Sequence, residues 1–332
     1  MTTKLKSFDS DGLQFAWDAT SVSSFEKCPR YYQLSHIQGW QPANKSEHLI
    51  FGGVYAAALE RFHKLCAEGS DREDALHEVV RQALIETWEH EREPDYDDCQ
   101  DEGCPHFGTP HGHKGARIPG TGEPWNSLHN TKTRGTLIRT IVWYIDHFAD
   151  DPVKVLTLDN GQAACELSFS LEFSNDILWC GHLDSAVEYM NGQYVMDQKT
   201  TGSTISGYYF EQYNPDVQMG GYSWAGQQIL GSPVKGVIID AAQIAVGSSR
   251  FQRGFVHYSR QLLDEWYTMT ALTIEDARRA TAENNFRMNR SACGNYGGCA
   301  FRKVCSRIPE HRERVLRADF VQRPRWDPLE RR

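Results

Sequence analysis

The feature that most constrains the fold is a pair of strand-like runs separated by Asn191-Gly192. The runs, Ile177–Tyr189 and Gln193–Thr200, are rich in aromatic and β-branched residues. Asn-Gly between such runs is the strongest short-range signal for a hairpin with a two-residue turn. We therefore expect an antiparallel strand pair in which Asn191 and Gly192 form the loop.

Three charged side chains share one face of this predicted hairpin. The turn pairs Asp184 with Lys199, and Asp197 lies two residues before Lys199 on the same strand. Opposed Cβ atoms lie ~5 Å apart and diagonal ones ~7–8 Å apart, so one divalent cation fits between the two carboxylates. Oxygen ligands of this kind suit Mg²⁺ or Mn²⁺. Since a bound metal activates water and an ammonium group steadies phosphate charge, the pattern predicts phosphodiester hydrolysis, with a cross-strand salt bridge as the alternative.

The rest of the chain has the pattern of one α/β domain spanning residues 1–332. Helical spacing, strand-like runs and helix starts alternate, and Asn214-Pro215-Asp216 predicts the start of a helix that reaches Gly231. Between residues 93 and 126 the periodicity disappears, which indicates an inserted loop. The loop contains possible zinc ligands in no recognisable spacing, namely Cys99, Cys104, His106, His111 and His113.

Composition and charge narrow the classes of function. The chain carries 35 basic and 44 acidic residues, a net charge of −9, which argues against a general polyanion binder but leaves room for a local basic groove. No segment approaches the ~18 apolar residues of a membrane span, and the N-terminus has no hydrophobic signal region. We therefore expect a cytoplasmic protein with no membrane partner. No P-loop motif is present, so the chain has no helicase motor.

The nine cysteines fall into two groups. An odd number in a chain without an export signal argues against a disulfide framework, so metal ligation or burial must account for them. Cys66, Cys165 and Cys180 lie in apolar surroundings and are expected in the core. Those that stand out are an early cysteine and a late cluster, Cys28, Cys293, Cys299 and Cys305.

Two motifs resemble a known family. Gly181-His182-Leu183-Asp184, then twelve residues, then Asp197-Gln198-Lys199-Thr200-Thr201-Gly202 resembles the core of the PD-(D/E)XK nuclease superfamily, in its RecB-like branch. Gln218-Met219-Gly220-Gly221-Tyr222 resembles that branch's Gln-x-x-x-Tyr motif, with both side chains on one helix face. The resemblance implies a restriction-endonuclease-like core, a mixed sheet flanked by helices. It also implies that Gln218 and Tyr222 act in catalysis by orienting the lysine and contacting DNA. The implied metal-binding residues are Asp184, Asp197 and Gln198.

The cysteine arrangement is similar to that of iron–sulfur nucleases of the same branch, including AddB-type nuclease domains and CRISPR-associated RecB-like exonucleases. The similarity implies a [4Fe-4S] cluster on Cys28, Cys293, Cys299 and Cys305. Such a cluster would join residues 20–32 to residues 287–310 in a helical region. The gap from Cys299 to Cys305 matches the family, whereas the gap from Cys293 to Cys299 is longer than usual. Zinc on the same thiolates is the inorganic alternative.

The sequence departs from the family pattern at one position. The RecB-like branch carries a metal-binding His in the helix after its first Gly, and alignment of residues 51–55 places Tyr55 there. His63 is expected on the helix surface. His182 is expected on the face of Asp184, and Glu166 is a weaker acidic candidate on the preceding strand.

Together these features predict a metal-dependent DNA exonuclease that acts on single strands or DNA ends, with any helicase or recombination partner supplied in trans. Two alternatives stay open: a non-catalytic DNA-binding protein that carries the cluster, and a site-specific endonuclease.

Overall fold

The structure is a computed structural model that describes residues 7–42, 46–87, 124, 125, 127, 129–174 and 176–329. The loop predicted at residues 93–126, with its cysteines and histidines, lies outside the described residues except for two positions near its end, 124 and 125. None of the helices in the described ranges is long and apolar enough to cross a bilayer.

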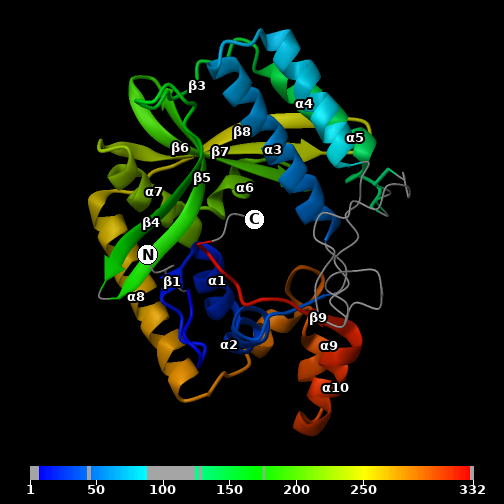
Figure 1. The fold of residues 1–332 in the computed structure, drawn as a ribbon, viewed down its shortest axis with the longest axis vertical. Helices are drawn as coiled ribbons and strands as arrows, with labels where there is room; N and C mark the ends of the chain where they lie inside the picture. Colours follow the sequence, from blue (N-terminus) through cyan, green and yellow to red (C-terminus); the bar gives the residue numbers. More distant parts are fainter. Residues whose placement is uncertain are drawn as a thin grey trace, which may run out of the picture.

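A mixed β-sheet forms the centre of the molecule (Figure 1). Its strands are β1 (Ala16–Trp17), β3 (Lys154–Val155), β4 (Cys165–Ser174), β5 (Ile177–Tyr189), β6 (Gly192–Thr201), β7 (Val234–Ile244) and β8 (Ser249–Val256). The order is β1-β5-β6-β7-β8, with β3 and β4 also paired to β5. Strands β6 and β7 run parallel, whereas β5–β6 and β7–β8 are antiparallel. The predicted mixed sheet flanked by helices is therefore confirmed, and it fits a restriction-endonuclease-like fold.

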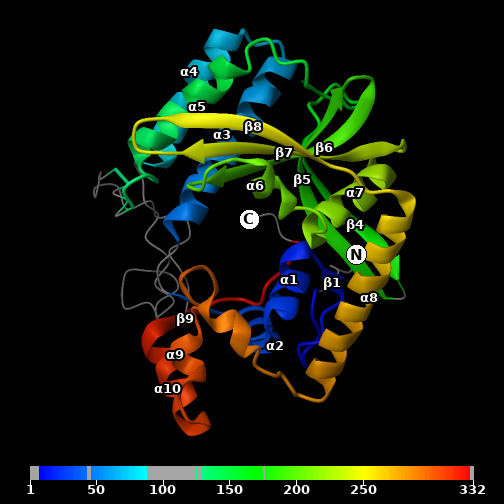
Figure 2. The same cartoon turned by 180° about the vertical axis from the view of Figure 1, so that it is seen from behind.

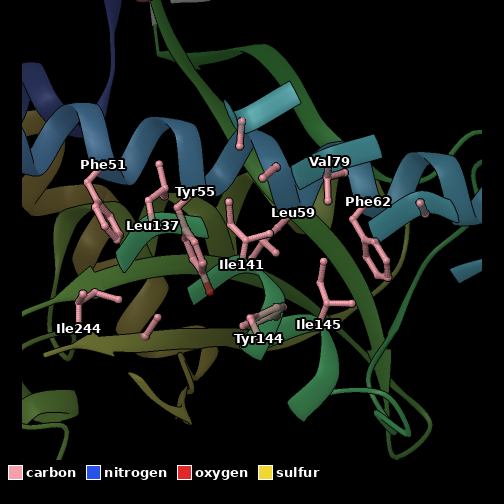
Figure 3. Close-up of a cluster of buried hydrophobic side chains, with 14 of the residues drawn as sticks. Phe51, Tyr55, Leu59, Phe62, Val79, Leu137, Ile141, Tyr144, Ile145 and Ile244 are labelled. Carbon is pink, nitrogen blue, oxygen red and sulfur yellow. The ribbon is translucent and has the colours of Figure 1, made fainter. Parts of the chain in front are cut away.

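Helices cover both faces of this sheet (Figures 1 and 2). The longer helices are α1 (Ala19–Lys27), α3 (Glu47–Ala67), α4 (Arg72–Glu86), α5 (Arg134–His147), α7 (Val217–Ile229), α8 (Arg260–Ala282) and α10 (Pro309–Asp319). On one face α3, α4 and α5 pack on β7 through a core that includes Tyr55, Ile141 and Ile244 (Figure 3). On the other face α7 and α8 pack on β5, where Trp179 and Trp266 meet edge to face.

Short elements complete the chain. They are α2 (Pro29–Tyr32), the π-helix η1 (Gln33–Ile37), β2 (Trp40–Pro42), α6 (Gly207–Glu211), the 3-10 helix η2 (Arg290–Gly297), α9 (Arg302–Cys305) and β9 (Phe320–Gln322). The two ends of the chain meet here, because β2 pairs antiparallel with β9. The backbone N–H of Arg30 also donates to the carbonyl of Arg287 at 3.2 Å.

The hairpin forms, but its predicted register is wrong by two residues. The turn consists of Met190 and Asn191, both with positive φ, and Tyr189 pairs with Gly192. Positive φ at both central residues is the geometry of the type I′ turn that suits the twist of a hairpin. Because side chains alternate with a period of two, a shift of two residues keeps every side chain on its predicted face. Asp184 consequently lies opposite Asp197 rather than Lys199.

The start of α7 also differs from the prediction. The helix begins at Val217, and Asp216 is its N-cap, so Pro215 lies outside the first turn. The Asp216 carboxylate accepts hydrogen bonds from the N–H groups of Gln218 and Met219 at 2.8 and 3.0 Å. A side chain that satisfies two otherwise unpaired N–H groups is a strong N-terminal cap.

Candidate active site

Asp197 and Lys199 form an ion pair at the centre of the site. Lys199 Nζ donates to Asp197 Oδ1 at 2.8 Å and lies 2.7 Å from Oδ2, which has no hydrogen-bond partner. The Asp197 side chain is 1% exposed, whereas 27% of the Lys199 side chain reaches solvent. Burial alone lowers the pKa of Lys199, but the carboxylates of Asp197 and Asp184 outweigh it and raise that pKa above its usual value. The lysine therefore stays charged, and part of its side chain reaches solvent.

Asp184 adds a second carboxylate beside this pair. Its Oδ2 accepts a hydrogen bond from the backbone N–H of Gln198 at 2.8 Å. Burial, together with the negative charge of Asp197, raises the pKa of Asp184 to about 7, although Lys199 acts in the opposite direction. Two carboxylates thus share one ammonium group. A site with this imbalance gains stability from another proton or from a bound cation.

A chain of hydrogen bonds holds the lysine from the other side. Lys199 Nζ donates to Gln218 Oε1 at 3.1 Å, and Gln218 Nε2 donates to the Tyr222 hydroxyl at 2.9 Å. The one-turn spacing of Gln218 and Tyr222 on α7 lets the amide lie between the phenol and the ammonium group. The structure therefore brings together all five side chains predicted for catalysis.

The two glycines between Gln218 and Tyr222 bring α7 close to its neighbours. A Cβ at Gly221 would lie 2.7 Å from Cζ2 of Trp179 on β5, and one at Gly220 would overlap Trp266 of α8. Larger residues would push the helix away from both layers. The close approach of α7 to the sheet is what places the Gln218 amide within reach of Lys199.

The donor set fits a hard divalent cation. Across the described ranges, no three or more His, Cys, Asp or Glu side chains are grouped as a metal site, so the candidate donors are the two carboxylates. Mg²⁺ is commonly held by one or two carboxylates and keeps several of its waters. Gln198 was also predicted to bind metal, but only its backbone atoms lie beside the two carboxylates. Side chains alternate along a strand, so the Gln198 side chain lies on the opposite face of β6 from Asp197.

Sequence reasoning missed a pair of tyrosines beside this group. The hydroxyls of Tyr209, on α6, and Tyr213 lie 3.0 Å apart. Burial raises the pKa of Tyr213, and its hydrogen bond with Tyr209 and the charges of Asp197 and Asp216 act in the same direction. No sequence signal singled them out, because α6 is a short helix with no motif.

Tyr55 does not occupy the place that the family alignment gave it. It belongs to the buried stripe of α3 with Phe51 and packs edge to face on Tyr144 (Figure 3). Its hydroxyl is buried without a hydrogen-bond partner near Asp240, which pairs with Gln198 and so lies on the face opposite Asp197. The prediction is wrong because the helical periodicity sends this side chain into the core.

A different stripe of α3 faces the end of β6. A Cβ at Gly52 would lie 3.6 Å from Thr200 Oγ1, and residues one and two turns further are Ala56 and Glu60. The charges of both Glu60 and Asp184 reach the Cys165 thiol, whose pKa burial raises to about 12. Glu60 therefore lies on the side of α3 that approaches β6, and its spacing of eight residues, or two helical turns, from Gly52 was the signal that could have identified it.

The other weaker candidates differ in their outcomes. His63 was expected at the helix surface, but its Nε2 is buried without a hydrogen-bond partner and burial lowers its pKa to about 4. His182 Nδ1 lies 2.8 Å from the Ser168 hydroxyl on β4. Glu166 lies between two regular pairs of the β4–β5 ladder and has a positive φ of 52°. Its negative charge contributes to the raised pKa of Asp184.

The four singled-out cysteines lie in one neighbourhood. The backbone N–H of Asn289 donates to Cys28 Sγ at 3.3 Å, and Cys293 Sγ donates to the Asn289 carbonyl at 3.7 Å. Burial raises the pKa of both Cys299 and Cys305, and the negative charge of Cys28 contributes to each shift. All four cysteines are free thiols in the structure. Their donor chemistry suits a soft metal centre.

Comparison with known proteins identifies a family and similar solved structures. The family model of the PD-(D/E)XK nuclease superfamily matches residues 16–306. The crystal structure of a "Putative exonuclease" from Eubacterium rectale is similar with a TM-score of 0.48 and 12% identity, over 93% of this chain and 94% of that chain. No curated protein matches the sequence.

Proposed function

Because the chain belongs to the PD-(D/E)XK nuclease superfamily, we propose that it is a metal-dependent DNA exonuclease acting on single strands or DNA ends. The observation that carries the proposal is the position of Lys199, held at 2.8 Å by Asp197 and at 3.1 Å by Gln218. A lysine needed only for an ion pair would not require a second, amide partner that is itself held by Tyr222.

Each residue has a distinct task in this proposal. Asp184 and Asp197 would hold Mg²⁺ or Mn²⁺, which when bound lowers the pKa of a water and offsets the charge of the phosphate. Lys199, fixed in place by Asp197 and Gln218, orients that water or stabilises the charge that develops on the phosphate oxygens. Gln218 and Tyr222 position the lysine.

The decisive experiment uses labelled DNA. Single-stranded, double-stranded and circular DNA are incubated with Mg²⁺ or Mn²⁺, using wild type, Lys199→Ala and the control Lys154→Ala. Lys154 is an exposed lysine of the same sheet on β3. We expect wild type and the control to shorten linear DNA and Lys199→Ala to be inactive. Near-wild-type turnover by Lys199→Ala would contradict the assignment of this group as the active site.

The same assay separates the alternatives. Cleavage of circular DNA would replace the exonuclease with an endonuclease. No cleavage of any DNA, combined with retained binding, would make the protein a DNA-binding relative of these nucleases.

We also propose that Cys28, Cys293, Cys299 and Cys305 hold a [4Fe-4S] cluster. Support comes from the contacts of Cys28 and Cys293 with Asn289, from the packing of Cys299 and Cys305 in one cluster, and from the resemblance of the spacing to iron–sulfur nucleases. When bound, such a cluster would join the two ends of the chain through covalent metal–sulfur bonds.

The cluster is tested by anaerobic purification of wild type, Cys28→Ser and the control Cys66→Ser. We expect a brown protein with about four irons per chain in wild type and the control, and loss of colour in Cys28→Ser. A colourless wild-type protein with stoichiometric zinc would refute the iron assignment.

A further inference from the structure

A cavity of about 710 Å³ lies outside the catalytic site, between α10 and the segment that runs through η1 and β2. Figures 1 and 2 show α10 at the end of the molecule opposite α4. Such a volume is within the range of ordinary ligand sites in proteins. The cavity is lined by both ends of the chain and is separate from the group around Asp197.

The lining of this cavity is strongly basic in an acidic protein. Four arginines line it, against the single carboxylate of Glu313. Residues 302–325 contain eight Arg or Lys and three Asp or Glu, whereas the whole chain has a net charge of −9. A concave surface that concentrates positive charge attracts polyanions. The four arginines are Arg312, Arg317, Arg323 and Arg325.

Two of these guanidinium groups are directed by backbone carbonyls rather than neutralised by acids. Arg312 Nε donates to the carbonyl of Arg307 at 3.1 Å. Arg325 donates to three backbone carbonyls, from Nε to Ile37 at 3.0 Å, from Nη2 to Ser10 at 3.2 Å and from Nη1 to Asp9 at 2.5 Å. Within the described part of the chain, neither forms an ion pair with a carboxylate. Arg312 therefore keeps its Nη groups for an anion, and guanidinium groups bind phosphate through paired N–H donors. Arg325, with all three nitrogens engaged, contributes mainly its positive charge.

The remaining arginine on α10 keeps most of its charge available as well. Arg317 Nη2 lies 2.7 Å from Glu313 Oε1, but both side chains are more than two-thirds exposed. An exposed pair of this kind is weak and screened by salt. Arg317 can therefore exchange Glu313 for a phosphate oxygen.

The floor of the cavity is apolar and includes an aromatic ring. Leu34, Leu316 and the half-buried Trp40 lie there, in the same apolar cluster as Cys299 and Cys305. A basic groove that contains an aromatic side chain is the usual arrangement for single-stranded nucleic acid, where arginines follow the phosphates and bases stack on rings.

We infer that this arginine-lined cavity, here called the arginine groove, binds the sugar–phosphate backbone of single-stranded DNA. The inference rests on the proposed function for the choice of DNA as the polyanion. The groove would hold the strand at a distance from the reacting phosphate, so it would contribute to binding of long substrates and not to the chemical step.

The test compares two double variants with the same change in charge. Arg312→Ala/Arg317→Ala removes two groove arginines, and Arg302→Ala/Arg314→Ala removes two exposed arginines of α9 and α10 that do not line it. Binding of fluorescent oligo(dT) is measured with EDTA present, so cleavage cannot interfere. Thermal unfolding checks that both variants fold.

We expect the groove variant to bind oligo(dT) at least about tenfold more weakly, because charge-assisted hydrogen bonds are lost. The slope of log affinity against log salt should fall by about 1.4, since each phosphate contact contributes about 0.7 for single strands. Equal weakening in both variants, or in neither, would overturn the groove. Tighter binding of oligo(U), or equally effective displacement by polyglutamate, would overturn the choice of single-stranded DNA.

Two further measurements distinguish a failure of the arginine groove from a failure of the proposed function. Hydrolysis of bis(4-nitrophenyl) phosphate, too small to reach the groove, should be equal in wild type and the groove variant. If wild type hydrolyses no substrate, the proposed function fails while the binding assay still decides the groove. In the wild-type protein, oligo(dT) should protect Arg312 and Arg317 from phenylglyoxal but not Arg302 or Arg314, and absence of that protection would contradict the groove.

Discussion

The two faces of the central sheet carry buried charge clusters made of similar residues, and the clusters differ in how completely their charges are paired. Asp197 on β6 and Asp240 on β7 are both buried and lie on opposite faces, because Gln198 pairs with Asp240. We call the Asp197 side the open face and the Asp240 side the closed face.

On the closed face, one arginine engages two carboxylates. Arg253 makes two 2.7 Å hydrogen bonds to Asp151, and its Nε lies 3.4 Å from Asp240 Oδ1. Tyr144 donates to the other oxygen of Asp240, and the ring of Phe148 covers the guanidinium group. Helices α3 and α5 cover this face, and only 11% of the Arg253 side chain and 16% of the Asp151 side chain are exposed.

On the open face, the corresponding cation is Lys199, and it contacts only one of the two carboxylates. Lys199 contacts Asp197, while Asp184 accepts its hydrogen bond from the backbone. Lys199 is also more exposed than Arg253, at 27% against 11% of the side chain. Each cluster therefore has two carboxylates and one cation. The comparison teaches that such a set forms a structural cluster where the cation contacts both acids, and a metal-binding or reactive site where one acid has no direct cationic partner.

The largest expected effect comes from removing one charge on each face. Asp197→Asn should lower DNA cleavage by about 10²–10³-fold or more with little change in stability, because a metal-binding charge is lost. Asp240→Asn should leave cleavage near wild type but lower the free energy of unfolding by about 3 kcal/mol, because a buried ion pair is broken. Initial cleavage rates and urea denaturation measure the two quantities.

This comparison fails if the two variants behave alike. A loss of activity in folded Asp240→Asn would show that the closed face also takes part in catalysis. Lys199→Ala combined with Asp197→Asn should be little worse than either change alone, since residues that act as a unit are not additive.

A smaller effect is expected for the hydrogen bonds that support each cluster. Gln218→Ala should lower kcat by about 10–100-fold with KM nearly unchanged, because it positions Lys199 without holding the metal. Tyr144→Phe removes the corresponding support on the closed face and should leave kcat unchanged. A rise in KM without a fall in kcat for Gln218→Ala would instead assign Gln218 to DNA binding.

The third difference concerns pH and metal. The pKa of Asp184, raised to about 7, exceeds its unfolded value of about 3.9, so the metal-free folded state binds more protons between these values. Stability should therefore fall as the pH rises from about 4 to 7. Mg²⁺ should oppose that fall by binding the ionised pair, contributing about 2.7 kcal/mol at a hundred times its Kd.

Thermal unfolding of wild type, Asp184→Asn and Asp240→Asn with and without Mg²⁺ checks this. Stabilisation by Mg²⁺ should be present in wild type and Asp240→Asn and absent in Asp184→Asn. Equal stabilisation of all three proteins would place the cation elsewhere.

The smallest effect is expected at Tyr55. Tyr55→Phe removes a buried hydroxyl that has no hydrogen-bond partner, so stability should stay equal or rise by about 1 kcal/mol. The ratio of Mn²⁺- to Mg²⁺-supported cleavage should not change, because the residue faces the closed cluster. A changed ratio would show that α3 rotates in the working enzyme.

Much of the candidate site could be predicted from sequence because it depends on the regular spacing of side chains within single strands and helices. The hairpin places Asp184 and Asp197 on one face through the two-residue period of strands, and that face survives a register error of two. One helical turn places Gln218 and Tyr222 together in the same way. Each inference needed only the geometry of a single element or of one turn.

The contacts between separate helices and strands could be seen only in the tertiary structure, because residue spacing within one element does not specify them. Tyr55 and Gly52 are three residues apart on α3, yet only the packing of that helix shows which of them faces β6. The closed cluster joins Asp151 to Asp240 and Arg253, which are paired on β7 and β8, and the arginine groove joins Trp40 to Arg312. Such contacts depend on how separate elements are oriented when they bury their apolar faces, and a one-dimensional pattern specifies which face is buried but not what lies against it.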